Sequence, residues 1–169
     1  MKKSILVLGL SLALLTISGG DVLAQASKEI SEPSTSTWYS TAKVLPLGED
    51  RNFVTVEATA VFISDEGKGL FHEATARSSG SFLVEKGVVK NYGGYFCFFL
   101  KNGDKVFVKF SAPDFTAGAP ANGKTTIIGS TGKSVGIQGS WDWTFYPLRP
   151  AAEGIGQSYF KHTLKYQLP

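Results

Sequence analysis

From Trp38 to the C-terminus, the chain has no sustained apolar periodicity of the i, i+3, i+4 type, which argues against a fold built on amphipathic helices. Runs of β-branched and aromatic residues recur instead, separated by Gly, Asn and Asp. An antiparallel barrel or a sandwich of about eight short strands is therefore expected. The predicted strands cover residues 38–45, 53–64, 72–84, 88–100, 105–111, 124–129, 140–146 and 158–168.

Two of these strands alternate cleanly between apolar and other residues, so one set of side chains in each should face the interior. The pattern places one histidine, His162, among apolar neighbours. The inward residues are predicted to be Phe160, His162, Leu164, Tyr166 and Leu168 in the last strand, and Trp141, Trp143 and Phe145 in the strand before it.

The segment "FFLKNGDKVFV" predicts a β-hairpin with Asn102-Gly103 as a two-residue type I′ turn. That register turns Tyr95, Cys97, Phe99, Val106, Val108 and Phe110 inward. It leaves Phe96, Phe98 and Leu100 on the outside with Lys105, Phe107 and Lys109. An outer face this mixed is either a contact between subunits of a homo-oligomer or a surface strand with exposed aromatics, and both remain open.

The N-terminus has the three parts of a secretory signal peptide. Lys2 and Lys3 precede an apolar run from Ile5 to Ile17, and Val22-Leu23-Ala24 ends in a small residue before Gln25. The apolar run is well short of the roughly 20 residues that a membrane span needs. We predict a signal peptide over residues 1–24, export to the periplasm or beyond the cell, and no stable membrane anchor after cleavage.

Residues 25–37, rich in Ser and Thr, are predicted to form a flexible leader, and residues 38–169 a single barrel domain. A domain of this length buries enough surface to fold without disulfides. The formal net charge of +3 gives little attraction for nucleic acid. With one cysteine, Cys97, the chain has no internal disulfide; the thiol is buried and inert, paired with another chain, or reactive.

The segment "TTIIGSTGKSVGIQGSWDW" matches three catalytic motifs by chance. A P-loop would need glycine where Ile127 stands and a helix after Ser134. The G-x-S-x-G and S-x-x-K motifs also need a helix, and glycines interrupt the residues that would form it. A glycine-rich connection between two strands remains.

"GSTGKSVGIQG" resembles the G-G-[ST]-G-x-x-x-G-[IV]-x-G signature of the allene oxide cyclase-like barrels, which are related to the dirigent proteins. "GLFHEATARSSG" and "GGYFCFFLKNGDKVFV" precede it in the order that the family shows, and the similarity covers roughly residues 55 to 168. The resemblance implies a small eight-stranded antiparallel β-barrel of calycin-like architecture with an apolar lumen, and several members are dimers or trimers. Allene oxide cyclases form a cyclopentenone with the help of a carboxylate, whereas dirigent proteins orient phenoxy radicals without chemistry of their own.

The leading functional hypothesis is an exported barrel that binds a small apolar or aromatic molecule, with no cofactor and no metal. The predicted ligand-binding residues are Tyr95, Cys97, Phe99, Trp141, Trp143, His162 and Tyr166. An isomerase or cyclase would need His162 or Glu57 beside the substrate, but alternation favours an outward Glu57. A barrel with a packed lumen that acts through protein partners is the third hypothesis.

Overall fold

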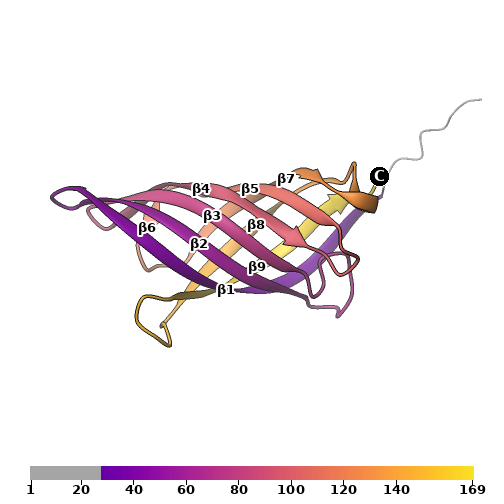
Figure 1. The fold of residues 1–169 in the computed structure, drawn as a ribbon, viewed down its shortest axis with the longest axis horizontal. Helices are drawn as coiled ribbons and strands as arrows, with labels where there is room; N and C mark the ends of the chain where they lie inside the picture. Colours follow the sequence, from indigo (N-terminus) through magenta and orange to yellow (C-terminus); the bar gives the residue numbers. More distant parts are fainter. Residues whose placement is uncertain (1–27) are drawn as a thin grey trace, which may run out of the picture.

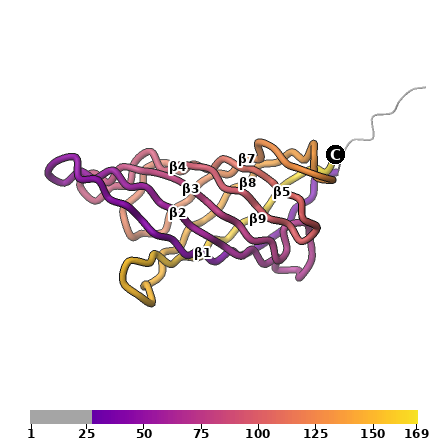
Figure 2. The backbone as a smooth tube through the Cα atoms, in the orientation of Figure 1, coloured from indigo at the N-terminus to yellow at the C-terminus, as the bar shows by residue number. Residues whose placement is uncertain are grey.

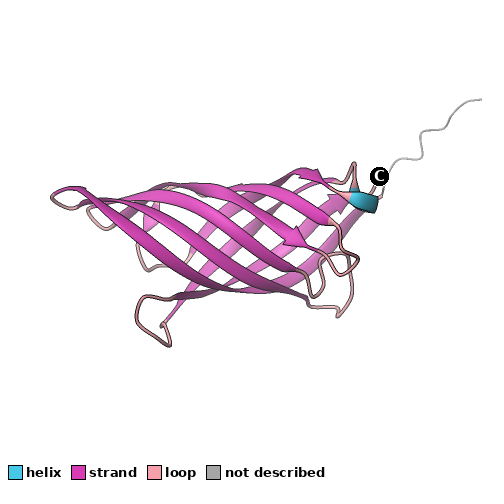
Figure 3. Ribbon diagram, viewed as in Figure 1, coloured by secondary structure: helices cyan, strands magenta, loops and turns pink. Residues whose placement is uncertain are grey.

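The computed structural model describes residues 28–169, so the predicted signal peptide over residues 1–24 lies outside the described residues. The described chain is mostly β-strand, joined by loops and turns, with one short 3₁₀ helix (Figure 3). It contains no helix that is long and apolar enough to cross a membrane. The elements in chain order are β1 (Glu29–Gly48), β2 (Arg51–Ser64), β3 (Thr75–Glu85), β4 (Val88–Phe99), β5 (Lys105–Ser111), β6 (Phe115–Thr116), β7 (Ala121–Ser130), η1 (Gly132–Ser134), β8 (Gln138–Leu148) and β9 (Gly156–Gln167).

The strands form one closed antiparallel barrel. The order in the sheet is β3-β2-β1-β9-β8-β7-β5-β4, and β3 pairs with β4 to complete the circle. The two-residue strand β6 continues β5 along β4 in the same register, so it extends the wall of this circle of eight and is not a ninth strand. The predicted eight-stranded all-β barrel is therefore confirmed, and the sandwich alternative is wrong.

The two ends of the barrel differ (Figure 1, Figure 2). At one end, here called the closed end, lie the start of β1, the end of β9, the β2–β3 connection and η1. At the other end, here called the mouth, lie the β1–β2 hairpin, which projects beyond the other strands, and the β8–β9 loop. The segment between β5 and β7, which includes β6, also lies at the mouth.

The predicted flexible leader is wrong for residues 29–37, which form the first part of β1. This segment pairs with β9 from Glu29 onward and with β2 from Ser34 onward. Its polar composition concealed the strand, because Glu32, Ser34 and Ser36 are the side chains that face the interior. Two backbone ladders hold this part of β1, and the apolar alternation that sequence reasoning relies on is absent.

The predicted register of the β4–β5 hairpin is wrong by one residue. Phe98 pairs with Val106, and Gly103 N–H donates to the Leu100 carbonyl at 3.0 Å, which closes a three-residue loop. Only Gly103 in this loop has a positive φ, as in a type I turn followed by one left-handed residue. A shift of one residue exchanges the two faces of a strand. Phe96, Phe98 and Leu100 are therefore buried, and Tyr95, Cys97 and Phe99 face outward.

The glycine-rich segment is a clasp at the closed end. The Asp104 carboxylate accepts hydrogen bonds from the Ser134 backbone N–H at 3.0 Å and from the Ser134 hydroxyl at 2.9 Å. Gly132 has a φ of 62°, and a Cβ at this position would collide with that carboxylate. Ile137, just beyond η1, is buried in the core. The three catalytic motifs match a segment whose role is to fasten the β7–β8 connection to the β4–β5 turn.

Replacing Asp104 by alanine should lower the free energy of unfolding by about 3 kcal/mol, because it removes charge-assisted hydrogen bonds and leaves buried donors of Ser134 unpaired. Asp142→Ala, which removes an exposed carboxylate on β8, is the matched control and should change it by less than about 0.5 kcal/mol. Urea unfolding measures both values. Equal effects of the two substitutions would contradict the clasp.

The half of the lumen next to the closed end is packed solid. Phe71, from the β2–β3 connection, is fully buried there, and its ring centroid lies 4.6 Å from that of Phe98 and 5.2 Å from that of Tyr166. Trp141 packs against the same ring at 6.1 Å. Phe71 thus acts as a plug in this half of the lumen, and the cavity described below lies on the side of the mouth.

Candidate functional site

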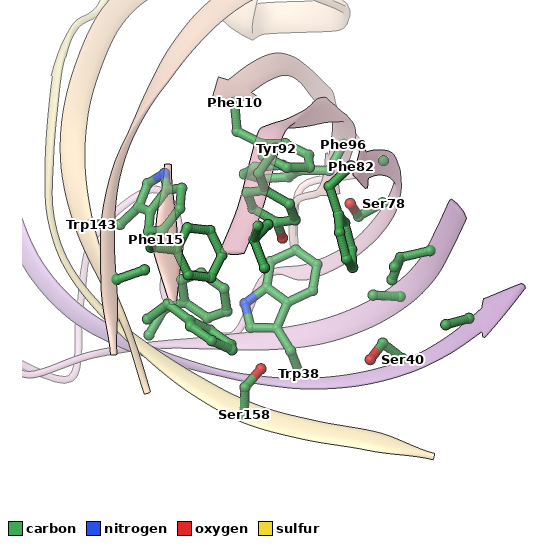
Figure 4. Close-up of a pocket in the computed structure, with 18 of the residues that line it drawn as sticks. Trp38, Ser40, Ser78, Phe82, Tyr92, Phe96, Phe110, Phe115, Trp143 and Ser158 are labelled. Atoms are coloured by element: carbon green, nitrogen blue, oxygen red, sulfur yellow. The ribbon is translucent and has the colours of Figure 1, made fainter. Parts of the chain in front are cut away.

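The half of the lumen next to the mouth is hollow. It encloses a cavity of about 340 Å³ whose wall is formed by inward-facing residues of the barrel strands and by the β5–β7 segment. Figure 4 shows aromatic side chains converging on this space from several strands, with the hydroxyls of Ser40, Ser78 and Ser158 at its margin. Among residues 28–169, no Asp, Glu, Lys or Arg lines the cavity.

Aromatic rings make up most of the cavity wall. Trp38 of β1 lies between Phe96 of β4, with ring centroids 5.6 Å apart, and Phe160 of β9, at 5.7 Å. Trp143 of β8 is edge-on to Phe160 at 5.3 Å. The rings pack against one another at these separations, so the aromatic wall of the cavity is already formed in the unliganded fold.

A β-bulge in β4 directs Tyr92 into the cavity. The β3–β4 register shifts between Ser81 and Leu83, and Asn91 takes a φ of 55°. Tyr92 then packs against Phe110 at 5.4 Å and Trp143 at 6.3 Å (Figure 4). Burial raises the pKa of its phenol to about 12. Within residues 28–169 its hydroxyl has no hydrogen-bond partner, so it offers a neutral polar tip to a ligand.

The β5–β7 segment, here called the strap, extends the barrel wall at the mouth, because β6 continues β5 along β4 in the same register. Phe115 and Ala117 line the cavity, and the Phe115 ring meets that of Tyr92 edge-on at 5.9 Å. The strap is held to β4 by a two-residue ladder and by Ala117 N–H, which donates to the Gly87 carbonyl at 2.9 Å. So short a ladder holds this segment less firmly than the long ladders hold the other strands of the wall.

His162 stands at the floor of the cavity in a chain of polar side chains. Trp38 Nε1–H donates to Ser36 Oγ at 2.8 Å, and Ser36 Oγ lies 2.7 Å from His162 Nε2. The imidazole is stacked parallel to the Phe160 ring, and its centroid lies 5.2 Å from that of Phe62. Burial among these rings lowers the pKa of His162 to about 3, so the side chain is neutral at physiological pH.

The free energy of unfolding should decrease as the pH is lowered, because of His162. In the unfolded chain the imidazole takes up a proton below about pH 6.5, whereas in the fold it does so only near pH 3. The contribution is therefore complete above pH 6.5 and is lost at about 1.4 kcal/mol per pH unit between these values. His162→Gln should flatten the free energy of unfolding over this window. Identical pH profiles for the wild type and His162→Gln would contradict the assignment.

A buried carboxylate, Glu32, lies at the closed end and was missed by sequence reasoning. Tyr166 Oη–H donates to Glu32 Oε2 at 3.0 Å, and Leu70 N–H donates to Tyr166 Oη at 3.4 Å. Burial raises the pKa of Glu32, although the hydrogen bond from Tyr166 opposes this, and burial raises that of Tyr166 to about 12. Glu32 does not line the cavity. Its alternation with Ser34 and Ser36 ahead of Trp38 was the available signal of a strand.

The predicted ligand-binding residues fall into three groups. Trp143 and His162 line the cavity. Trp141 and Tyr166 are buried inside the barrel, in the packed half. Tyr95, Cys97 and Phe99, which we expected to face inward, lie on the outer surface because of the register error. The aromatic residues of the cavity wall that the predicted ligand-binding set omitted are Trp38, Phe82, Tyr92, Phe96, Phe110, Phe115, Phe145 and Phe160.

Glu57 faces outward, as the alternation in β2 indicated, and its carboxylate lies 3.4 Å from the guanidinium of Arg77. Near this ion pair, Tyr95, Phe99 and Phe107 leave an exposed apolar patch on β4 and β5. The outer face that we predicted is wrong in its β4 residues, because Phe96 and Phe98 are buried and Tyr95 and Phe99 are exposed in their place. Among residues 28–169, no cluster of three His, Cys, Asp or Glu could hold a metal ion.

No protein-family model matches the chain, and no curated protein matches it. Among solved structures, that of the pterocarpan synthase dirigent protein GePTS1 is similar over 94% of this chain and 100% of that chain. The TM-score is 0.47 and the sequence identity is 10%. This likeness is too remote to carry function from one protein to the other.

Proposed function

We propose that this chain is an exported binding protein that holds a small apolar or aromatic molecule in the mouth half of its barrel, without chemistry of its own. The supporting observation is the cavity of about 340 Å³, lined by aromatic rings and bearing a few hydroxyls. Small-molecule sites have this character and begin at about this size. Protein interiors are normally close-packed, as the half of the lumen filled by Phe71 is. A cavity in the other half is therefore a departure from ordinary core packing.

The protonation of the cavity wall supports binding without catalysis. General acid–base catalysis works best with a group whose pKa lies near the working pH. The titratable side chains in the wall are Tyr92 and His162, with pKa values of about 12 and about 3. Neither exchanges a proton readily at neutral pH.

A cyclase of the allene oxide type is less well supported, because it would need a carboxylate beside the ligand. Glu57 lies on the outer surface, paired with Arg77. Glu32 points into the barrel but belongs to the packed half, next to Tyr166 and the Phe71 plug. A ligand in the cavity would reach neither carboxylate.

Titration with N-phenyl-1-naphthylamine, a neutral probe that fluoresces in apolar surroundings, tests the proposal. Residues 25–169 should bind one probe per chain. Trp38 and Trp143 line the cavity, so their emission should be quenched in step with the rise in probe fluorescence. Absence of saturable binding by this probe, and by smaller aromatic hydrocarbons, would refute a ligand-binding lumen.

A further inference from the structure

Tyr92 faces the cavity only because β4 is distorted next to it. Val89 and Tyr92 both line the cavity, although their odd separation would place them on opposite faces of a regular strand. The register shift between Ser81 and Leu83, together with the φ of 55° at Asn91, changes the alternation between them. Bulges of this kind are frequent beside binding sites, where they redirect one side chain. The distortion therefore singles out this phenol as a group directed into the cavity.

The Tyr92 hydroxyl is open to the cavity and has no hydrogen-bond partner within residues 28–169. Side-chain polar atoms of this part of the chain that are both unpartnered and closed to solvent belong to Glu32, Ser34, Trp141 and His162. The Tyr92 oxygen is not one of these enclosed atoms, so a ligand can reach it without moving the side chain. Figure 4 shows the Tyr92 ring extending from β4 toward Trp38, in the midst of the aromatic side chains.

A ligand that fills the cavity would remove water from this hydroxyl. Burial raises the pKa of Tyr92 to about 12, so the oxygen carries its proton at physiological pH. A purely apolar ligand would leave that O–H donor unsatisfied, and an unsatisfied buried donor opposes binding. A ligand with an acceptor at this point would restore the hydrogen bond, and a site of this kind discriminates against analogues that lack the acceptor.

The surroundings of Tyr92 restrict the kind of molecule that can carry the acceptor. The rings of Phe82, Phe110 and Phe115 lie around it, with centroids 5.6, 5.4 and 5.9 Å from its own. The body of the ligand must therefore be apolar. No charged side chain of the described residues lines the cavity, so an ionised acceptor would lose its hydration without a counter-charge. The acceptor is therefore expected to be neutral.

We propose that the cavity is selective for apolar molecules that carry a neutral hydrogen-bond acceptor, such as a carbonyl oxygen, and that Tyr92 Oη–H donates to this acceptor. The inference rests on the proposed function and adds the chemical class of the ligand and the residue that selects it. In this account Tyr92 determines specificity, and the bulge at Asn91 positions it.

Two rigid tricyclic probes test the selectivity, because 9-fluorenone differs from fluorene by a carbonyl in place of a CH₂ group. Displacement of N-phenyl-1-naphthylamine gives both affinities, and their ratio is compared between proteins so that the different hydration of the probes cancels. Tyr92→Phe keeps the ring and removes only the hydroxyl, so it should shift the ratio about tenfold toward fluorene, the equivalent of one net hydrogen bond. Tyr95→Phe removes an exposed hydroxyl from the outer face of β4 and should leave the ratio unchanged.

The outcomes separate this inference from the proposed function. A ratio unchanged in Tyr92→Phe would overturn the inference, and Ser78 and Ser158, whose hydroxyls also line the cavity, would then be the donors to examine. Binding of N-phenyl-1-naphthylamine without binding of 9-fluorenone would also overturn the inference alone. If the wild type binds none of the three compounds, the proposed function fails with it.

Difference infrared spectra of bound 9-fluorenone report the hydrogen bond itself. A hydrogen bond weakens the C=O bond, so the carbonyl stretch should lie at a lower frequency in the wild-type complex than in the Tyr92→Phe complex. Equal frequencies in the two saturated complexes would rule out donation from Tyr92.

Discussion

Replacing Ala58 by phenylalanine is expected to abolish binding of N-phenyl-1-naphthylamine, with a loss of affinity of about 100-fold or more. Ala58 lies on β2 and lines the cavity, so a benzyl group at this position occupies the volume that the ligand needs. The added ring fills a void that already exists, so the free energy of unfolding should change by less than about 1 kcal/mol. Fluorescence titration and urea unfolding measure the two quantities.

The neighbouring substitution Thr59→Phe is the matched control. Thr59 is exposed on the outer face of the same strand, and a phenylalanine there should leave the affinity within about twofold. If Thr59→Phe weakens binding as strongly as Ala58→Phe, the probe binds on the outside of the barrel and the lumen is not the site.

Replacing Phe71 by alanine is expected to lower the free energy of unfolding by about 3–5 kcal/mol, as for other fully buried phenylalanines. The substitution removes the ring that meets Phe98, Trp141 and Tyr166. It should also extend the hollow part of the lumen toward the closed end. Thermal and urea unfolding of the variant measure the loss of stability.

Phe99→Ala serves as the control for this loss and also tests the β4 register. Phe99 is 43% exposed on the outer face, so its removal should cost about 1 kcal/mol or less. In the register that the hairpin pattern predicts, Phe99 would be a core residue and its removal would be as damaging as that of Phe71. Equal losses for the two variants would therefore contradict the structure.

The architecture could be predicted because most strands alternate apolar and polar residues, and this alternation is itself the cause of the barrel. The last strand shows this: His162, Leu164 and Tyr166 are buried, while Lys161 and Lys165 are exposed. The signal also separated the two faces of β2 and put Glu57 outside. Such a pattern is read within a single strand, so it predicts which face is buried even when the order of the strands in the sheet is not known.

The β4 face could not be predicted, because residues 95–100 are nearly all apolar and either face could have been the core. The turn decided the register. Asn102-Gly103 suits a two-residue loop and equally a three-residue loop in which Gly103 alone is left-handed. Choosing the wrong loop misplaced Tyr95, Cys97 and Phe99 together, because a register shift moves every side chain of the strand.

Two further features left little trace in the sequence. The bulge at Asn91 brings Tyr92 into the cavity. The left-handed conformation of Asn91 that forms this bulge is a property of the backbone, and the sequence pattern does not predict it. The first part of β1 places Glu32, Ser34 and Ser36 inside the barrel. Their burial depends on partners far along the chain, Tyr166 for Glu32 and His162 for Ser36, which short-range patterns do not report.

The structure of the wild-type protein in complex with N-phenyl-1-naphthylamine is the most direct test of the central claim. The account predicts that the probe lies inside the barrel, between Trp38, Tyr92 and Trp143, beneath the strap that carries Phe115. A probe seated instead on the outer patch formed by Tyr95, Phe99 and Phe107, with the lumen unoccupied, would contradict it.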